Sequence, residues 1–121
     1  MQDDAVLNKY LIIPIKPGPE YDYLTADAKK QLVTEFYAVS NDSNRMGMRL
    51  EGRPLKSSRY QLANSLPVLP GFIQLPPSGL PMIILQDGQT SGGYPRIAYV
   101  PEQYFPILNQ IPLGGRFRFQ L

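Results

Sequence analysis

The chain has 121 residues, of which 43% are hydrophobic, and its formal net charge is only +2. This composition predicts one globular domain over residues 1–121. No apolar run is long enough to span a membrane, so we expect no membrane partner. The basic residues are scattered, so we expect no nucleic acid partner either. The absence of Cys and His fits a cytoplasmic protein and excludes disulfides, thiol nucleophiles, imidazole metal ligands and Ser-His-Asp catalysis within this chain, so we expect no metal site.

Thirteen prolines and ten glycines divide the chain into short segments. Residues 11–15 predict a first strand, which Pro14 places at an edge or a bulge because proline lacks the amide N–H that a central strand donates. Residues 25–35 form the one convincing helix, with Thr25 as N-cap and Asp27 in the positive first turn. The apolar stripe of this helix predicts that it packs onto one end of a barrel.

Six further segments with alternating or continuous apolar residues predict strands. They are residues 36–40, 45–51, 72–75, 82–85, 94–100 and 116–119. In the second of these segments Met46, Met48 and Leu50 alternate with polar residues or glycine, which is typical of a half-buried strand. Pro101 begins a short helical turn that ends near Leu108. Short strands separated by frequent turns predict an all-β barrel or sandwich.

The stretch 86–95, QDGQTSGGYP, is the most informative segment for function. It lies between two apolar runs and is longer than the roughly two to five residues of an ordinary hairpin loop. Gly92 and Gly93 can adopt positive φ and let backbone N–H groups approach another group, and a concave cluster of such groups binds anions or carbonyl oxygens. The stretch is therefore either a binding loop on a β scaffold or a long turn whose glycines serve only its geometry.

Two charged residues are the candidate catalytic groups. Arg45 follows a turn cluster and begins a predicted strand, and its guanidinium can hold a carboxylate or phosphoryl group bidentately. Alternatively, it pairs with Glu51 or Asp42, or caps loop carbonyls. Asp87 is the only carboxylate of the 86–95 stretch, and it acts either as a general base or orienting group or as an Asx turn that organises the loop.

The candidate substrate-binding residues are amides, a hydroxyl, two glycines and a tyrosine. They are Asn44, Gln74, Gln89, Thr90, Gly92, Gly93 and Tyr94. Gln74 interrupts an apolar run, so its amide either satisfies loop backbone or faces a pocket. Gln89 and Thr90 suit a small amide or ureido group, whereas a residue such as Asn44 more often forms a turn and one such as Tyr94 more often packs in the core or rim of a barrel.

Three ordered motifs carry a family resemblance. They are SNRMGMRLEG at 43–52, LPGFIQLPPSG at 69–79 and DGQTSGGYP at 87–95. Together with IKPGP at 15–19 and LGGRFRF at 113–119, they closely resemble the C-terminal half of the allophanate hydrolase subunit 2 family. That family includes the KipI antagonist KipA, the C subunit of the bacterial 5-oxoprolinase, and part of the carboxyltransferase region of urea carboxylase.

The resemblance implies a cyclophilin-like β-barrel with one main helix and a short helical turn, forming the second half of a longer family chain. It also implies a KipI-like subunit 1 partner and a small amide or ureido substrate. The family's assembly uses ATP to open 5-oxoproline to glutamate, and its urea carboxylase relatives use biotin. We expect this chain alone to bind no cofactor.

Two hypotheses follow from this resemblance. In the first, the chain is a non-autonomous part of a hydrolase and contributes a substrate pocket that is completed by a KipI-like protein. In the alternative, it is a non-catalytic regulatory module that binds and antagonises a KipI-like protein. Leu80 and Gly88 stand where family members commonly have Gln and Arg, and these departures leave the exact substrate open.

Overall fold

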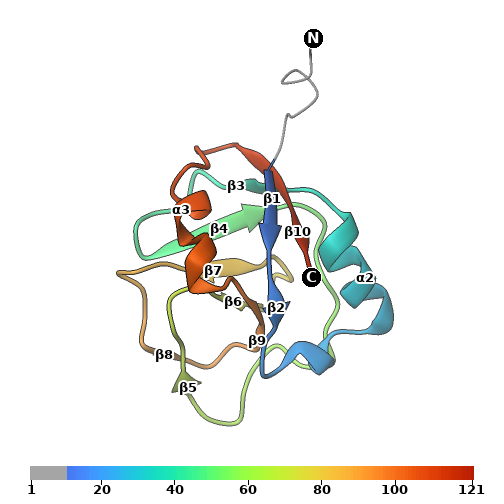
Figure 1. Cartoon of the computed structure of the whole chain (residues 1–121). Helices are drawn as coiled ribbons and strands as arrows, with labels where there is room; N and C mark the ends of the chain where they lie inside the picture. The colour runs from blue at the N-terminus through green and yellow to red at the C-terminus, as the bar shows by residue number, and fades with distance from the viewer. Residues whose placement is uncertain (1–10) are drawn as a thin grey trace.

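Residues 11–121, which the computed structural model describes, fold around one strongly curled sheet (Figure 1). Its eight strands lie in the order β1-β10-β3-β4-β7-β6-β9-β2. Their bounds are β1 Leu11–Pro14, β2 Lys16–Pro17, β3 Tyr37–Val39, β4 Gly47–Glu51, β6 Phe72–Gln74, β7 Met82–Ile84, β9 Arg96–Tyr99 and β10 Arg116–Gln120. The predicted mostly-β, barrel-like fold is thereby confirmed.

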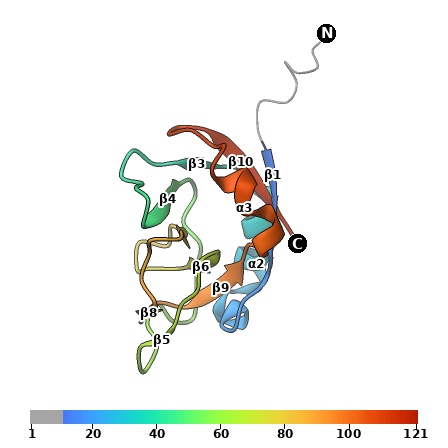
Figure 2. The same cartoon turned by 60° about the vertical axis from the view of Figure 1, so that its left-hand side comes forward.

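The first chain segment brings the two edges of this sheet together. β1 and β2 lie at opposite ends of the strand order, yet only Ile15 separates them in the chain. β1 pairs in parallel with β10, and β2 pairs antiparallel with β9. The backbone N–H of Ile15 donates to the carbonyl of Gln120 at 2.8 Å. Pro14 therefore ends an edge strand, as predicted, at the point where the segment passes from one edge to the other. Figure 2 shows β1 beside β10.

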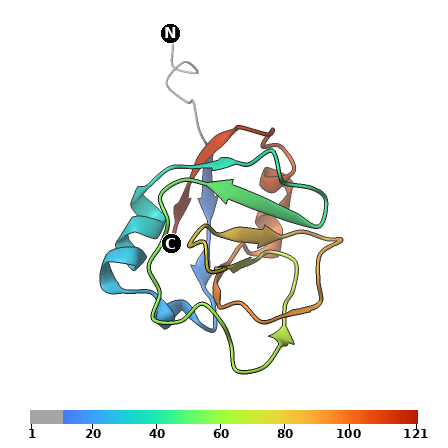
Figure 3. The ribbon, with the colours of Figure 1, turned by 180° about the vertical axis from the view of Figure 1, so that it is seen from behind.

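Helices flank the sheet rather than fill it. The main helix, α2 (Ala26–Thr34), begins after Thr25, whose hydroxyl accepts a hydrogen bond from the N–H of Ala28 at 3.1 Å. It buries Ala28 and Leu32 and packs beside β10 (Figures 1 and 3). Three short elements complete the set: the 3₁₀ helices η1 (Tyr21–Tyr23) and η2 (Glu102–Tyr104), and α3 (Phe105–Leu108). The predicted helix and helical turn are both present.

The core lies inside the curl of the sheet. Phe117 and Phe119 of β10 are fully buried, with their ring centroids 5.2 Å apart, and Tyr37 packs 5.6 Å from Phe119. Burial raises the pKa of the Tyr37 hydroxyl above its ordinary value. The alternation of residues 116–119 thus places both phenylalanines inward, as predicted.

One predicted strand begins later than its sequence pattern indicates. Residues 44–47 form a turn, because the backbones of Asn44 and Gly47 exchange hydrogen bonds of 3.1 and 3.2 Å. The side-chain oxygen of Asn44 also accepts from the N–H of Met46 at 2.8 Å. Arg45 therefore lies in the turn rather than at the start of a strand, and Met46 is exposed instead of alternating into the core.

The 86–95 stretch contains a strand that its composition does not predict. β8 (Ser91–Gly92) pairs antiparallel with β5 (Leu66–Pro67), and we call this pair the β5–β8 ribbon. The ribbon lies beyond β6 and β9, away from β3 (Figure 1). Among the described glycines, positive φ occurs at Gly71, Gly79 and Gly114. Neither Gly92 nor Gly93 uses the positive φ that glycine allows, and Gly92 is instead paired within β8.

Candidate functional site

Two small hollows lie next to each other where β7 ends. Gly47 faces Ile84 in the β4–β7 register, so the turn at 44–47 lies beside the residues that follow β7. The first hollow, of about 230 Å³, is lined by Arg45, Pro70, Gly71, Ile84, Leu85, Gln86, Asp87, Phe105, Leu108 and Asn109. The second hollow, of about 130 Å³, is lined by Asn44, Met46, Gly47, Arg49, Met82, Ile84 and Gln89. Ile84 contributes to both.

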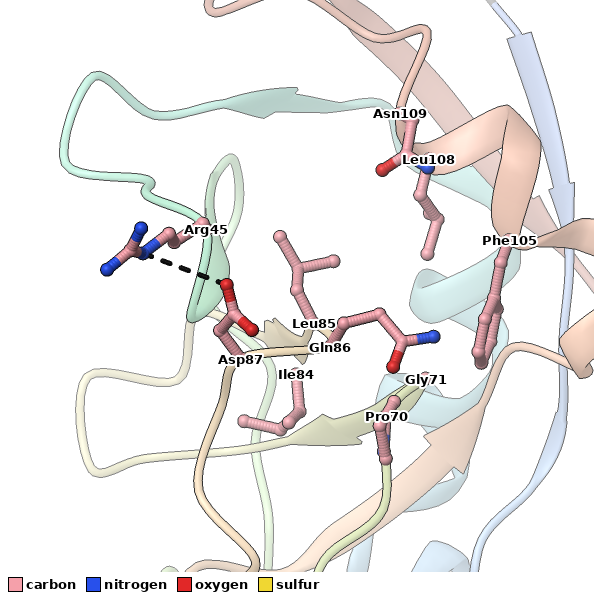
Figure 4. Close-up of a pocket in the computed structure, with 10 residues that line it drawn as sticks. All are labelled: Arg45, Pro70, Gly71, Ile84, Leu85, Gln86, Asp87, Phe105, Leu108 and Asn109. Carbon is pink, nitrogen blue, oxygen red and sulfur yellow. Dashed lines mark ion pairs between the residues drawn. The ribbon is translucent and has the colours of Figure 1, made fainter.

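The first hollow has one charged side and one apolar side. Figure 4 shows Arg45 and Asp87 on one side and Phe105 and Leu108 on the other, with the amide of Gln86 between them. The Nε atom of Arg45 lies 3.7 Å from Oδ2 of Asp87, and the two side chains are 86% and 62% exposed. An ion pair this exposed contributes only about 0–1 kcal/mol. The guanidinium and the carboxylate are therefore readily available to another partner.

Gly88 allows the 86–95 stretch to sit tightly against the turn at 44–47. The N–H of Leu85 donates to the carbonyl of Met46 at 3.2 Å, and the N–H of Gly88 donates to the carbonyl of Leu85 at 2.9 Å. A Cβ atom at Gly88 would clash with the Met46 carbonyl oxygen. An arginine at this position, as in the resembling family, therefore requires a different backbone.

Gln74 is fully buried, and within residues 11–121 neither atom of its amide has a hydrogen-bond partner. Its neighbours Ile73 and Leu75 belong to the core, so the alternation of β6 turns Gln74 to the outer face of the sheet. Gly92 of the β5–β8 ribbon lies over it. A Cβ atom there would lie 2.6 Å from Nε2 of Gln74 and 3.4 Å from Oε1 of Gln89. The two amides thus approach the same point.

An ion pair that the sequence reasoning missed anchors this region. Arg96 donates from Nε and Nη2 to the two carboxylate oxygens of Glu20, each at 2.8 Å, and its backbone N–H donates at 2.9 Å. Its Nη1 donates to the carbonyl of Pro67 in the β5–β8 ribbon. These hydrogen bonds hold the pKa of Glu20 below its ordinary value of 4.5. No local pattern reveals this pair, because its members are 76 residues apart.

The structure distributes the sequence-predicted site residues over this end of the barrel. Arg45 and Asp87 share the first hollow, Asn44 and Gln89 share the second, and Gln74 lies behind the second. Four others, Thr90, Gly92, Gly93 and Tyr94, line neither of these two hollows. The carbonyls of Thr90 and Gly93 instead accept hydrogen bonds from Val68 and Leu62, which hold the ribbon in place. The single pocket that the sequence predicts is thus divided in two.

The described part of the chain lacks two features. None of its helices is long and apolar enough to cross a bilayer. Residues 11–121 also contain no group of three or more Asp and Glu side chains positioned to hold a metal ion. The polar groups that remain are an arginine–carboxylate pair, amides and backbone, which suit binding of a small polar molecule.

The curled barrel with two polar-rimmed hollows at one strand end defines a β-barrel of the cyclophilin-like type, similar to the barrels of carboxyltransferase domains. The chain belongs to the family described as "Carboxyltransferase domain, subdomain A and B", which it matches over residues 3–121. Both the fold and the three sequence motifs agree with this membership.

Relatives and solved structures support the same family. The chain is 41% identical over 103 residues to the C subunit of 5-oxoprolinase from Escherichia coli, covering 85% of this chain and 33% of that protein. It is 32% identical over 109 residues to the corresponding C subunit from Haemophilus influenzae, covering 90% and 35%. The urea amidolyase of K. lactis superimposes with a TM-score of 0.85 at 26% identity, covering 93% of this chain and 7% of that one. The chain thus spans about a third of the length of the two 5-oxoprolinase C subunits.

Proposed function

We propose that this chain is a non-autonomous component of an ATP-dependent 5-oxoprolinase, or of a related allophanate hydrolase or urea carboxylase assembly. It contributes a substrate-binding surface, and a KipI-like protein together with the remainder of the family chain completes the site. The homology to two 5-oxoprolinase C subunits supports this assignment. ATP, or biotin in urea carboxylase-type assemblies, acts elsewhere in the complex.

The observation that carries the proposal is the weak pair of Arg45 and Asp87 at the rim of the first hollow. A phosphoryl or other anionic group that reaches Arg45 competes with Asp87 for the guanidinium, because a bidentate pair is stronger than the 3.7 Å contact seen here. Asp87 is then free to orient an N–H group or to accept a proton from water. The remaining atoms of a small substrate lie against Phe105 and Leu108.

Reconstitution tests this proposal. The chain is combined with the remainder of the family chain and with the partner proteins, and 5-oxoproline-dependent ATP hydrolysis is measured. We expect no activity from the chain alone, and about tenfold or greater loss in the Arg45→Ala and Asp87→Asn assemblies, because a misplaced substrate loses its reactive geometry. Arg53→Ala is the matched control, since Arg53 makes an exposed 3.9 Å pair with Glu35 away from both hollows. An assembly whose ATP hydrolysis does not increase when 5-oxoproline is added would refute the proposal.

An apolar groove beside the first hollow favours the regulatory alternative, in which the chain binds and antagonises a KipI-like protein without turnover. The groove is lined by Leu69, Pro70, Phe72, Gln86, Tyr99, Val100, Pro101, Glu102 and Phe105. Leu69 is largely exposed, and apolar surface of this kind marks protein contacts. Two results together would support this second function. The Leu69→Asp variant would no longer retain the KipI-like protein in a pull-down, and the assembly containing the parent chain would show no ATP turnover.

A further inference from the structure

The unpartnered amide of Gln74 is the feature of this molecule that its fold does not explain. It is fully buried, both of its polar atoms lack a hydrogen-bond partner within residues 11–121, and it lies outside the barrel core. Leucine or methionine would fill the same space without a polar atom. Buried polar groups are normally paired, so an orphaned one points to a partner that arrives from outside.

The chemistry of a primary amide defines that partner. Nε2 donates and Oε1 accepts, and both atoms lie on one edge of a planar group. A lactam or a urea also presents an N–H and a C=O on one edge, because its amide is cis. Such a group can therefore form two hydrogen bonds with Gln74 at once. A trans amide, as in an open chain, presents the two groups on opposite edges and satisfies only one of them.

The second hollow offers a route to this amide. Met82, which lines the hollow, pairs with Gln74 across β6 and β7. Gln89 also lines it, and its Oε1 atom and Nε2 of Gln74 both lie within 3.4 Å of the position that a Cβ atom on Gly92 would take. The cover is thin, since the β5–β8 ribbon is only two residue pairs long and the Gln89 side chain is exposed. Ligand entry requires the ribbon to open locally, which breaks the hydrogen bonds that Val68 and Leu62 donate to the carbonyls of Thr90 and Gly93.

Arg49 supplies the charge of this second hollow. It is the one charged residue among the seven that line it, and within the described residues its guanidinium makes no ion pair. In the sequence pattern Arg49 stands only as the polar side of an alternating strand. In this position it selects a ligand that carries a negative group.

We propose that Gln74 determines specificity for a small carboxylate-bearing cis-amide. The amide pairs with Gln74 beneath the β5–β8 ribbon, and Arg49 binds the carboxylate in the second hollow. This inference deepens the proposed function, on which it rests for the kind of assembly served. It assigns amide recognition to residues distinct from the pair at the first hollow.

A titration of the ¹⁵N-labelled full chain tests the inference without ATP or partner proteins. The probes are 5-oxoproline, N-acetylglycine as a trans-amide carboxylate, and proline as a ring carboxylate without an amide. We expect 5-oxoproline to shift the side-chain amide resonances of Gln74 and to bind at least tenfold more tightly than either control. Equal binding of the three probes, or no binding at millimolar concentration, would overturn the inference.

Variants separate recognition from folding. Gln74→Met keeps the volume and removes both polar atoms, so we expect a folded chain, verified by its amide spectrum, that binds 5-oxoproline at least tenfold more weakly. Arg49→Gln should weaken 5-oxoproline binding, and Arg49→Lys should restore part of it. If Gln74→Met binds as well as the parent chain, Gln74 holds only an ordered water and the inference fails. The proposed function is judged separately, by ATP turnover and Arg45→Ala.

Discussion

The ion pair of Glu20 and Arg96 provides the sharpest test of how this barrel is held together. The side chains of Arg96 and Glu20 are only 12% and 10% exposed, and three hydrogen bonds of 2.8–2.9 Å join the two residues. Glu20→Gln keeps the shape and one acceptor oxygen but leaves the guanidinium without its counter-charge. Removing one partner of a buried pair costs about 3–5 kcal/mol, and the retained oxygen places this variant near 3 kcal/mol. A domain stable by about 5–15 kcal/mol should remain folded after this loss.

Urea unfolding of the parent chain and of Glu20→Gln measures this loss of stability. The matched control is Glu35→Gln, because Glu35 pairs with Arg53 at 3.9 Å while the two side chains are 39% and 70% exposed. We expect the control to change the free energy of unfolding by less than about 0.5 kcal/mol. Equal effects of Glu20→Gln and Glu35→Gln would refute the reasoning that burial gives the pair its strength.

The same pair predicts a direction for the dependence of stability on pH. Since hydrogen bonds from Arg96 lower the pKa of Glu20 in the folded state, its stabilisation is fully present above the ordinary value of 4.5 and is lost as pH falls through the folded value. The stability difference between the parent chain and Glu20→Gln should therefore be constant near neutral pH. It should shrink below pH 4.5, and a difference that grows in acid would contradict this assignment.

Three further predictions concern backbone and packing. Gly71→Ala should lower the free energy of unfolding in urea by about 2 kcal/mol or more, since φ is +94° and a Cβ atom would lie 2.7 Å from the Phe105 ring. Gly114→Ala is the control: φ is +79° but the space around it is open, so the free energy of unfolding should fall by only about 1 kcal/mol. Thr25→Ala should lower the free energy of unfolding by about 1 kcal/mol through loss of the helix cap, while Thr25→Ser should restore it. Gly88→Ala should displace the loop from the facing turn, since its Cβ atom would clash with a carbonyl oxygen there, and should move the amide resonances of both segments; unchanged spectra would contradict this.

Local patterns predicted the parts of this fold that local physics controls. The alternation around Phe117 and Phe119 reflects the two-residue period of a strand, and the cap at Thr25 reflects the unpaired N–H groups of a helix start. The edge position of Pro14 follows from its missing N–H group in the same way. Each of these features depends on a few neighbouring residues, so the sequence alone was sufficient.

The local patterns failed where two local preferences compete for the same residues and where contacts join distant parts of the chain. At residues 44–47 the Asx turn of Asn44 outweighs the strand alternation, so Met46 turns outward. The β5–β8 ribbon joins two segments that are each too short to show a period. Glu20 and Arg96 meet only through the tertiary fold. The candidate site residues were chosen for their chemistry, but their placement around two hollows depends on tertiary packing, such as the close approach of Gly88 to Met46 and of Gly92 to Gln74.

The segment that joins both edges of the sheet has a consequence for the time course of folding. Leu11 pairs with Phe117 and Lys16 pairs with Tyr99, so closure requires contacts between distant parts of the chain. Proteins dominated by such contacts fold in milliseconds to seconds rather than microseconds. On the ribosome, the barrel cannot close until β10 has left the exit tunnel with its two core phenylalanines. Until then the nascent chain exposes apolar side chains and unpaired strand edges, which makes it a natural client of chaperones.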